Sequence, residues 1–504
     1  MAEKFSAITM FAGTFSKQYL NNEYFVLIHH IVGALARCPQ YGSLLLLYKR
    51  KRYDSANTAE NDSIMSKTAP SLHRSIGLAA LTLYGVGDIL GSGIYGLVGK
   101  AAGEMGYAVW LAFFVSMIAA GFTGLSYASL GSRYPKAGGA AYTTYRAFQM
   151  SFLSYVVGLA VLASGLTSMA TAARVFAGYF TGLVAPLPVL AVALVFSILV
   201  ALVVFRGIRE SLLVNGLCTL IEVSGLLLVI AFGASYIGSV NYLDATSVTN
   251  PTGEIKLSLV LTGAVLTFYS FVGFEDMLNV AEEVKEPRKT LPKGLILAIL
   301  ISSLVYMAVS LVAVSVVAPA ELAQSRQPLV DVVARAAPWF PTPIFSVVAM
   351  FAVANTALLN FIMGSRLLYG MSKQGLVPKF LNRVHPNRHT PHVAILVVWC
   401  LYAILIASGD ISSLAKSTSV LLLSCFIVVN LALVVLKRKE NFVGSFEVPS
   451  FVPVTGAIVC LAILSKAKES ELIMSGLIIA AISVLYFIMR PKPQSIEKLD
   501  ELAD

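Results

Sequence analysis

The chain has 504 residues, of which 57% are hydrophobic and only 13% are charged, and its mean hydropathy is +0.78. A soluble protein of this size cannot bury so much apolar surface, so the composition excludes a soluble globular fold. The formal net charge of +10 does not indicate a nucleic-acid partner, because the basic residues gather in the loops on one side of the predicted membrane segments.

Residues 1–70 are expected to form an N-terminal extension outside the membrane domain. Their apolar stretch, YFVLIHHIVGALARCPQYGSLLLLYKRKR, is interrupted by histidines, an arginine and a proline, which makes it a poor spanning segment. It also lacks the small-residue cleavage site of a signal peptide. A second methionine, Met65, opens a segment typical of a cytoplasmic start. We expect an over-extended start, or a disordered or interfacial arm, and assign it no function.

Apolar blocks of about 20 residues, the length of a helix that crosses a bilayer, fill a predicted transporter domain at 71–490. The strand alternation of a membrane barrel is absent, so the sequence predicts an all-α polytopic membrane protein with about twelve transmembrane helices. Two five-helix sets, at about 76–238 and 256–436, precede two further helices at about 451–490, and residues 491–504 form a tail. The helices are expected at 76–102, 106–130, 139–173, 186–206, 211–238, 256–284, 291–318, 341–372, 391–408, 413–436, 451–467 and 471–490.

The distribution of basic residues places both termini in the cytoplasm. Lysines and arginines are concentrated at 133–136, 206–209, 285–293, 373–388, 437–439 and 490–498, which all lie on one side of the predicted helices, and the opposite loops hold few. This asymmetry predicts a multi-pass protein of the cell (inner or plasma) membrane. The basic loops also attract anionic lipid, so membrane lipid is an expected partner and nucleic acid is not.

The helical pattern is interrupted at corresponding places in the two five-helix sets. The first predicted helix contains GDILGSGIYG, residues 87–96, and the sixth contains FYSFVGFEDMLNVAEEVKEPRKTLP, in which the mid-span Gly273 is followed by Glu275 and Asp276. Packing glycines would explain the first stretch but not the matching second one. Where a helix unwinds in lipid, its N–H and C=O groups need a polar cavity or a ligand. The pair therefore predicts a transporter binding site, and a zwitterionic amino acid suits the freed donors and acceptors.

These motifs resemble the amino acid–polyamine–organocation (APC) transporter superfamily. They are the Gly-Ser-Gly of residues 91–93, the aromatic-Ser-Phe-x-Gly-x-Glu of residues 269–275 and the Glu-Glu-x-x-x-Pro loop after them. The likeness covers about residues 71–490, includes YPKAGGAAYTTY and ALLNFIMGSRLLYGMSKQGLVPKFLNRVHPNRHTPH, and is strongest to the bacterial and cationic amino acid transporter branches. It implies two inverted five-helix repeats, with substrate bound at mid-membrane between the broken first and sixth helices.

The resemblance implies that backbone groups at the two interruptions hold the substrate. The carboxylate is expected at the backbone of Gly91, Ser92, Gly93 and Ile94. The amino group is expected at the backbone of Phe271, Val272 and Phe274, with the carbonyls of Ile89 and Leu90 beside it. Tyr269 falls where the arginine/agmatine exchangers of the family carry an aromatic gate, and a packed or lipid-facing aromatic is the alternative. The Ser92 hydroxyl is either a further substrate contact or bonded to its own backbone.

Acidic residues near the interruptions are candidates for coupling or charge recognition. Glu275 matches the family's acid just past the second interruption, whereas Asp276 is expected to point elsewhere, about 100° round the helix, so that the two do not serve one site. Asp88 replaces the family's more usual neutral residue. It recognises a positive substrate group, carries a proton, or is satisfied by freed backbone N–H groups.

Glu222 lies deep in the fifth predicted helix, in LCTLIEVSGLLLVIAFG. A proton-coupled relative carries a lysine there, and sodium-coupled relatives hold sodium. A buried carboxylate at this place is a candidate proton carrier or cation ligand, with a structural hydrogen bond as the alternative. The expected coupling ion is the proton, with sodium second. Asn355, Thr356 and Asn360 either face Glu222 and the first helix or make ordinary interhelical hydrogen bonds.

No cofactor or metal site is expected. The five cysteines share no metal-like spacing, and the histidines of HPNRHTPH belong to a proline-rich solvated loop. The sequence also lacks a phosphate-binding P-loop.

We therefore predict a secondary active transporter of amino acids, not an enzyme. Proton-driven uptake by symport is the first expectation, and exchange of amino acids or polyamines is the second. A nutrient sensor of the same fold would be favoured by a large soluble domain, an ion channel by a repeated filter sequence, and a membrane enzyme by catalytic groups at a common depth. None of these features is evident in the sequence.

Overall fold

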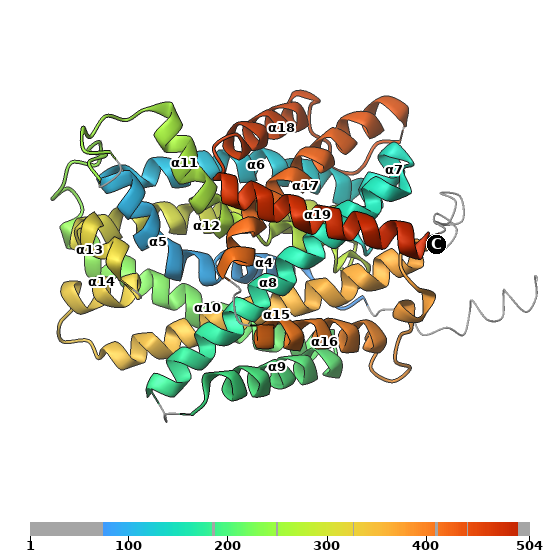
Figure 1. Cartoon of the computed structure of the whole chain (residues 1–504), viewed down its shortest axis with the longest axis horizontal. Helices are drawn as coiled ribbons and strands as arrows, with labels where there is room; N and C mark the ends of the chain where they lie inside the picture. Colours follow the sequence, from blue (N-terminus) through green and yellow to red (C-terminus); the bar gives the residue numbers. More distant parts are fainter. Residues whose placement is uncertain are drawn as a thin grey trace, which may run out of the picture. The chain divides into compact units, whose positions relative to one another are not determined.

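The computed structural model describes residues 74–183, 187–247, 250–325, 327–408, 412–440 and 442–491. The predicted extension at 1–70 and nearly all of the predicted tail at 491–504 lie outside these ranges. Figure 1 shows that the described part is built from helices.

Sixteen α-helices follow one another in the described chain. They are α4 (Leu78–Ile89), α5 (Ser92–Met105), α6 (Val109–Arg133), α7 (Gly139–Phe148), α8 (Ser151–Leu183), α9 (Val189–Arg206), α10 (Ile208–Gly233), α11 (Leu257–Phe268), α12 (Pro287–Val316), α13 (Pro319–Gln324), α14 (Pro328–Ala336), α15 (Thr342–Lys373), α16 (His392–Ser408), α17 (Ser412–Lys439), α18 (Phe451–Leu464) and α19 (Glu469–Met489). The 3-10 helices are η1 (Gly106–Ala108), η2 (Ala234–Tyr236), η3 (Tyr269–Phe271), η4 (Phe274–Leu278), η5 (Ala281–Glu283) and η6 (Lys379–Asn382).

The helical content and apolar lengths confirm an all-α polytopic membrane protein. In the described part, ten segments are long and apolar enough to cross a membrane. Two shorter apolar helices, His392–Ala407 and Phe451–Leu464, lie where the ninth and eleventh crossings are predicted. The count of twelve crossings and their inverted repeat stay predictions.

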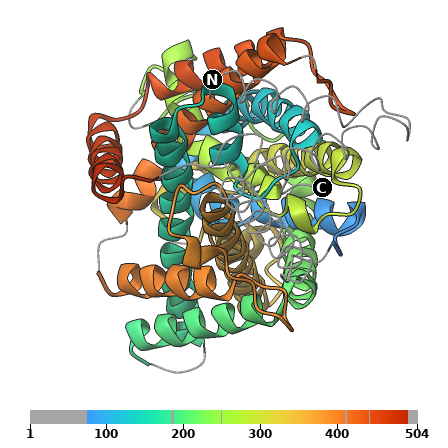
Figure 2. The ribbon, with the colours of Figure 1, turned by 90° about the vertical axis from the view of Figure 1, so that its right-hand side faces the viewer.

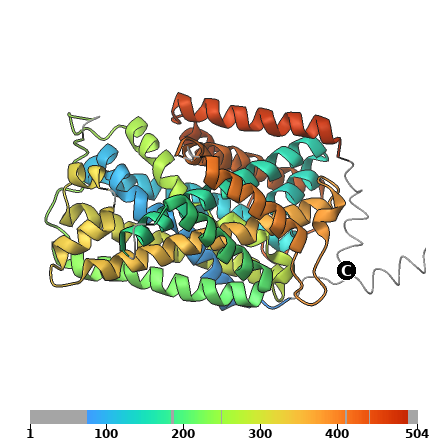
Figure 3. The same cartoon turned by 60° about the horizontal axis from the view of Figure 1, so that its bottom comes forward.

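Several helices expose apolar side chains on the outside of the bundle. Figures 1 and 2 show α9 and α16 side by side, and Figure 3 shows α19 along the surface. Leu199 on α9, Ile404 on α16 and Ile488 on α19 are each more than half exposed. Inside a bilayer such side chains meet lipid, so this exposure is the expected state of a membrane helix.

Polar side chains join the helices of the buried centre. The hydroxyl groups of Ser116 and Thr267 lie 2.8 Å apart and connect α6 to α11. The amide of Asn430 donates to the hydroxyl of Thr123 at 3.1 Å and connects α17 to α6. Such bonds hold membrane helices together where the lipid offers no hydrogen-bond partners.

The predicted third helix, 139–173, is wrong in two respects. It is divided into α7 and α8, because Gln149 adopts a left-handed backbone conformation with φ 55° and ends α7. The Gln149 N–H donates to the carbonyl of Tyr145, which caps the helix end. α8 then continues to Leu183 rather than ending near residue 173. Neither glycine nor proline stands at the division, so the sequence carries no ordinary signal for it.

The sequence also does not predict α13 and α14, which lie between α12 and α15. Each begins with a proline, Pro319 or Pro328, at its first helical position. α13 packs closely on α5, where a Cβ added to Gly99 would collide with the backbone of Leu322. Both helices are too short to cross a membrane, so no apolar block of spanning length marks them in the sequence.

The chain entering α4 pairs through its backbone with the last residue of η5 and the residues that follow it. The N–H groups of Ser75 and Ile76 donate to the carbonyl of Glu283 at 2.9 and 3.0 Å, and the N–H of Lys285 donates to the carbonyl of Ile76 at 2.8 Å. We call this contact the backbone pairing. It joins one end of the first interrupted segment to one end of the second.

The loops rich in basic residues carry acids that are matched by cations; we call this part the basic end. The ion pairs are Arg366–Glu283 at 2.8 Å, Lys373–Glu282 at 3.1 Å, Arg146–Glu440 at 3.0 Å, Arg133–Glu447 at 2.6 Å and Lys437–Glu447 at 3.1 Å. Burial by itself raises the pKa of Glu447, but hydrogen bonds from Arg133, the Gly444 N–H and Lys437 hold that pKa below its ordinary value.

Candidate binding site between two broken helices

The first predicted interruption is confirmed. α4 ends at Ile89, and α5 begins at Ser92 with Gly91 before it at φ −43° and ψ −153°. A Cβ added to Gly91 would collide with the Thr356 hydroxyl, and one added to Gly93 would lie 2.8 Å from the Cα of Ser270. Glycine is therefore needed here so that α15 and the second interruption can approach the backbone closely.

The second predicted interruption is confirmed as well, but its continuation differs from the prediction. α11 ends at Phe268, η3 comes next, and Val272 is extended at φ −64° and ψ 142°. Gly273 then takes φ 124°, a conformation that other residues rarely adopt. The acids beyond it lie on η4, a 3-10 helix, whereas the sequence predicts an α-helix to residue 284.

The two interruptions touch each other. A Cβ on Gly273 would lie 2.8 Å from the carbonyl carbon and 3.0 Å from the Cγ of Asp88. From α12, the fully buried Tyr306 hydroxyl contacts the carbonyl oxygens of Ile89 and Ser270, the latter at 2.7 Å. Tyr306 thus supplies a donor to carbonyls freed at both breaks. The sequence contains no sign of this role, because Tyr306 is one aromatic residue within an apolar run.

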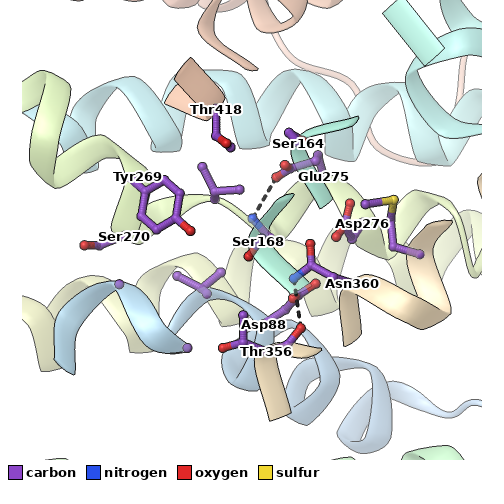
Figure 4. A pocket seen from close by; sticks show the side chains of 16 residues that line it. Asp88, Ser164, Ser168, Tyr269, Ser270, Glu275, Asp276, Thr356, Asn360 and Thr418 are labelled. Carbon is purple, nitrogen blue, oxygen red and sulfur yellow. Dashed lines mark hydrogen bonds between the residues drawn. The ribbon is translucent and has the colours of Figure 1, made fainter. Parts of the chain in front are cut away.

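A cavity lies between the two interruptions, and Figure 4 shows the side chains around it. Of the predicted site residues, Asp88, Ile89, Gly91, Gly93, Tyr269, Val272 and Glu275 line it. The lining residues that the sequence does not assign to the site are Ser164, Ser168, Ser270, Gly273, Asp276, Thr356, Asn360, Met363 and Thr418.

Among the predicted site residues whose side chains the structure describes, Ile94, Phe271, Phe274 and Glu222 do not line the cavity. Ile94 is fully buried in the helical core. The Phe271 ring packs edge-on against Tyr306 with centroids 5.1 Å apart, and the Phe274 ring packs against Phe426 at 5.2 Å. Their side chains thus support the wall of the cavity from behind. The Ser92 backbone begins α5, and its side chain lies outside the described part of the structure.

Both acids of the second interruption line the cavity, so the expectation that Asp276 points elsewhere is wrong. The expectation assumed an α-helix, whereas residues 274–278 form a 3-10 helix directly after a sharp backbone turn. Glu275 accepts a hydrogen bond of 2.9 Å from the Gly273 N–H. Asp276 interacts electrostatically with the carboxyl group of Asp88, which lines the same cavity. Neither lysine nor arginine is among the described residues that line the cavity.

Helices α8 and α15 provide the polar groups that the sequence leaves unassigned. Ser164 and Ser168 are four residues apart in sequence, as are Thr356 and Asn360, so each pair lies on one face of its helix. The Asn360 amide donates to the Thr356 carbonyl at 2.9 Å. The sequence leaves open whether Thr356 and Asn360 face Glu222 and the first helix or make ordinary interhelical hydrogen bonds. The structure places both at the cavity.

Glu222 lies outside the cavity lining, on α10. It is fully buried, and neither oxygen of its carboxylate has a hydrogen-bond partner among the described residues. Asn355 lies beside it and donates to the Thr219 hydroxyl at 3.0 Å. The Glu222 carboxylate also interacts electrostatically with Asp88. A buried acid without a partner is costly in a membrane protein and is therefore a functional candidate.

Comparison with known proteins extends these observations. The family described as amino acid permease matches residues 76–489. The chain is 29% identical over 417 residues to the branched-chain amino acid permease BcaP of Bacillus subtilis (strain 168), a match that spans 78% of this chain and 88% of that protein. It is 31% identical over 350 residues to cationic amino acid transporter 9, chloroplastic, of Arabidopsis thaliana, over 64% of this chain and 60% of that protein.

A third relative is the methylthioribose transporter of Bacillus subtilis (strain 168). It is 27% identical over 464 residues, which span 87% of this chain and 98% of that protein. The relatives are thus permeases and transporters. Because the family match runs from just before α4 to the end of α19, it includes both interruptions and the cavity between them. The resemblance to APC transporters is confirmed, and the chain belongs to the amino acid permease family.

Proposed function

We propose that this protein is a secondary active transporter that carries amino acids across the cytoplasmic membrane by alternating access. The observation that carries the proposal is the cavity where the two interrupted helices meet. Unwound backbone is tolerated at membrane depth only where it lines a cavity or holds a ligand. Two such segments at one cavity match the binding sites of secondary transporters.

The backbone at the cavity suits both ends of an amino acid. α5 begins at Ser92 without a side-chain cap, so its first N–H groups and the positive end of its dipole are available to a carboxylate. The carbonyls of Ile89 and Ser270 contact Tyr306, and each carbonyl oxygen has a second lone pair that an ammonium group can use. We assign the substrate carboxylate to residues 91–94 and the amino group to this carbonyl pair.

Side chains complete the proposed substrate site. Tyr269 lines the cavity and has an aromatic ring large enough to cover a small substrate. Val272 contributes its backbone at the second break, and the rings of Phe271 and Phe274 hold that backbone in place from behind. Both termini are proposed to lie in the cytoplasm, because the basic residues gather at one end of the bundle.

Coupling to protons is assigned first to Glu222. This carboxyl group is fully buried beside the first interrupted helix and has no hydrogen-bond partner among the described residues. A buried carboxyl group is less costly when it is protonated, so it can carry a proton through part of the cycle. Glu275 and Asp88 are further candidates because they line the cavity. Sodium is the alternative coupling ion.

Transport by the purified protein in liposomes tests the proposal. Labelled amino acids and polyamines are offered under a proton gradient, a sodium gradient or neither, with and without unlabelled substrate inside. The wild-type protein is expected to accumulate an amino acid when the proton gradient alone is present. Glu222→Gln is expected to abolish this accumulation but to retain exchange against internal substrate. Glu321→Gln, which changes an exposed acid on α13, is the matched control.

Three outcomes would contradict parts of the proposal. If Glu222→Gln accumulates substrate as the wild type does, Glu222 is not the proton carrier. If only internal substrate supports uptake, the protein is an exchanger. If no amino acid or polyamine is carried under any of these conditions, the transport function itself is wrong.

A further inference from the structure

We propose that Asp88 and Asp276 form a carboxyl pair that binds either one proton or one positively charged side-chain group of the substrate. The inference rests on the proposed transport function and adds a substrate class to it: amino acids with a cationic side chain, or diamines. It assigns a function to Asp276, which the proposed substrate and coupling sites leave unused.

The fold brings these two carboxyl groups together from different interruptions. Asp88 is in the last turn of α4, Asp276 is on η4, and each is at most 5% exposed. Gly273 makes the contact possible, because a Cβ at that position would lie 3.0 Å from the Cγ of Asp88. A larger residue would push the two segments apart.

Two buried carboxyl groups that face one cavity, with no cation among the described residues that line it, are costly when both are charged. A proton on one group of the pair lowers this cost. Two negative charges this close in a buried site would repel each other strongly. The proton can be replaced only by another positive group, such as an alkylammonium, which donates to both carboxylates.

Part of each carboxyl group remains available to a ligand. Asp88 Oδ2 and Asp276 Oδ1 are buried and lack a hydrogen-bond partner among the described residues. Both side chains line the cavity, as Figure 4 shows. A buried unpaired carboxylate oxygen is costly, so a donor that enters the cavity is bound favourably there.

The surroundings offer no competing cation to the pair within the described part of the chain. The titratable groups that interact with Asp88 or Asp276 are Glu275, Glu222, Tyr84 and Tyr127. Arg366 on α15 is held by Glu283, and Arg146 on α7 is held by Glu440. On α12, which packs against both segments, Lys289 and Lys293 are exposed.

An organic cation fits this site better than a metal ion. Within the described ranges, no three His, Cys, Asp or Glu side chains converge as a metal site would require. The cavity is also lined by Ser164, Ser168 and Asn360, whose hydroxyl and amide groups suit the polar atoms of an extended substrate. A side-chain ammonium at the pair would leave the α-amino and carboxylate groups to the two helix breaks.

Binding to the purified full chain in detergent tests the inference with matched ligands. L-Ornithine is compared with L-norvaline, and L-lysine with L-norleucine, because each pair differs by one side-chain ammonium. For the wild type, ornithine is expected to bind more tightly than norvaline. Because one proton leaves as the cation binds, its affinity should increase by up to about tenfold per pH unit over the range in which the pair titrates. Norvaline should release no proton, as measured in weakly buffered solution.

Asp276→Asn keeps the shape of the side chain and removes the charge. It is expected to abolish the preference for ornithine over norvaline and the proton release, while norvaline still binds. Asp88→Asn should likewise abolish the preference for ornithine and the proton release. Asp331→Asn, at an acid on α14 far from the pair in sequence, is the control and should leave all four ligands unaffected.

The outcomes separate this inference from the proposed function. If the wild type binds the neutral ligands but shows neither a cation preference nor proton release, the carboxyl pair is overturned and amino acid transport stands. If Asp276→Asn retains both properties, Asp276 has no part in binding. If none of the four ligands is bound or carried, the proposed function fails together with the inference.

Discussion

The acids of the basic end and the acids of the cavity differ in whether a cation lies beside them. At the basic end, Glu283 accepts hydrogen bonds from Nε and Nη2 of Arg366, at 2.8 and 3.1 Å, and both side chains are fully buried. At the cavity, Asp88 and Asp276 are almost as deeply buried but face no cation among the described residues. A buried carboxylate needs a partner. The ion pairs of the first group stabilise the fold, and the lack of a cationic partner in the second group is the basis of the ligand-binding role that we propose for it.

Removing a cation from the basic end should have the largest effect on stability. Arg366→Met leaves the Glu283 carboxylate buried and unpaired, which should destabilise the protein by about 3–5 kcal/mol. Thermal unfolding of the detergent-purified protein measures this. The double change Arg366→Met with Glu283→Leu should recover much of the loss, because no charge then remains buried. If Arg366→Met alone is as stable as the wild type, the ion pair does not stabilise the fold, and the two groups of acids do not differ in this respect.

Tyr306→Phe tests whether polar contacts at the cavity act on substrate binding rather than on stability. The change removes one hydroxyl that serves the carbonyls of Ile89 and Ser270 and leaves the aromatic packing with Phe271 in place. We expect the backbone at the breaks to be less well positioned, so KM should increase about fivefold, corresponding to roughly 1 kcal/mol for a hydrogen bond. The maximal rate and the unfolding temperature should change little. A lower unfolding temperature with an unchanged KM would assign Tyr306 to stability alone.

Acidification gives the smallest expected effect and concerns Glu447. Because its folded-state pKa is lowered, Glu447 stabilises the protein above the ordinary glutamate pKa of about 4.3, and this contribution is lost as the pH falls through the folded-state value. Glu447→Gln should therefore be less stable than the wild type at pH 7, by about 1 kcal/mol or less. The difference in unfolding temperature should narrow below about pH 4. A difference that grows in acid would contradict this assignment.

The sequence predicts the two interruptions well because their cause is local. Gly273 must adopt a positive φ, Gly91 and Gly93 must allow close contacts, and acids stand beside the breaks inside apolar runs. Local chemistry of this kind can be read from neighbouring residues. It is sufficient to place Asp88, Ile89, Tyr269 and Glu275 at one cavity.

The remainder of the site depends on geometry between distant segments. The sequence misplaces Asp276 because the turn at Gly273 leads into a 3-10 helix, which changes the direction of each side chain beyond it. Tyr306 reaches the breaks across a helix interface, and Ser164 and Thr418 belong to other helices altogether. Such proximity results from packing, for which a single sequence contains no direct signal.

The backbone pairing determines which substitutions can disrupt the contact between the two interrupted segments. Its hydrogen bonds run between main-chain atoms of Ser75, Ile76, Glu283 and Lys285, so they are present whichever side chains occupy these positions. Alanine substitutions at these positions would leave the main-chain hydrogen bonds in place. Proline lacks an N–H group, so a proline at position 75, 76 or 285 would remove one of these hydrogen bonds. In the alternating-access cycle that we propose, these main-chain hydrogen bonds would couple a movement of one interrupted helix to the other, whichever side chains occupy the four positions.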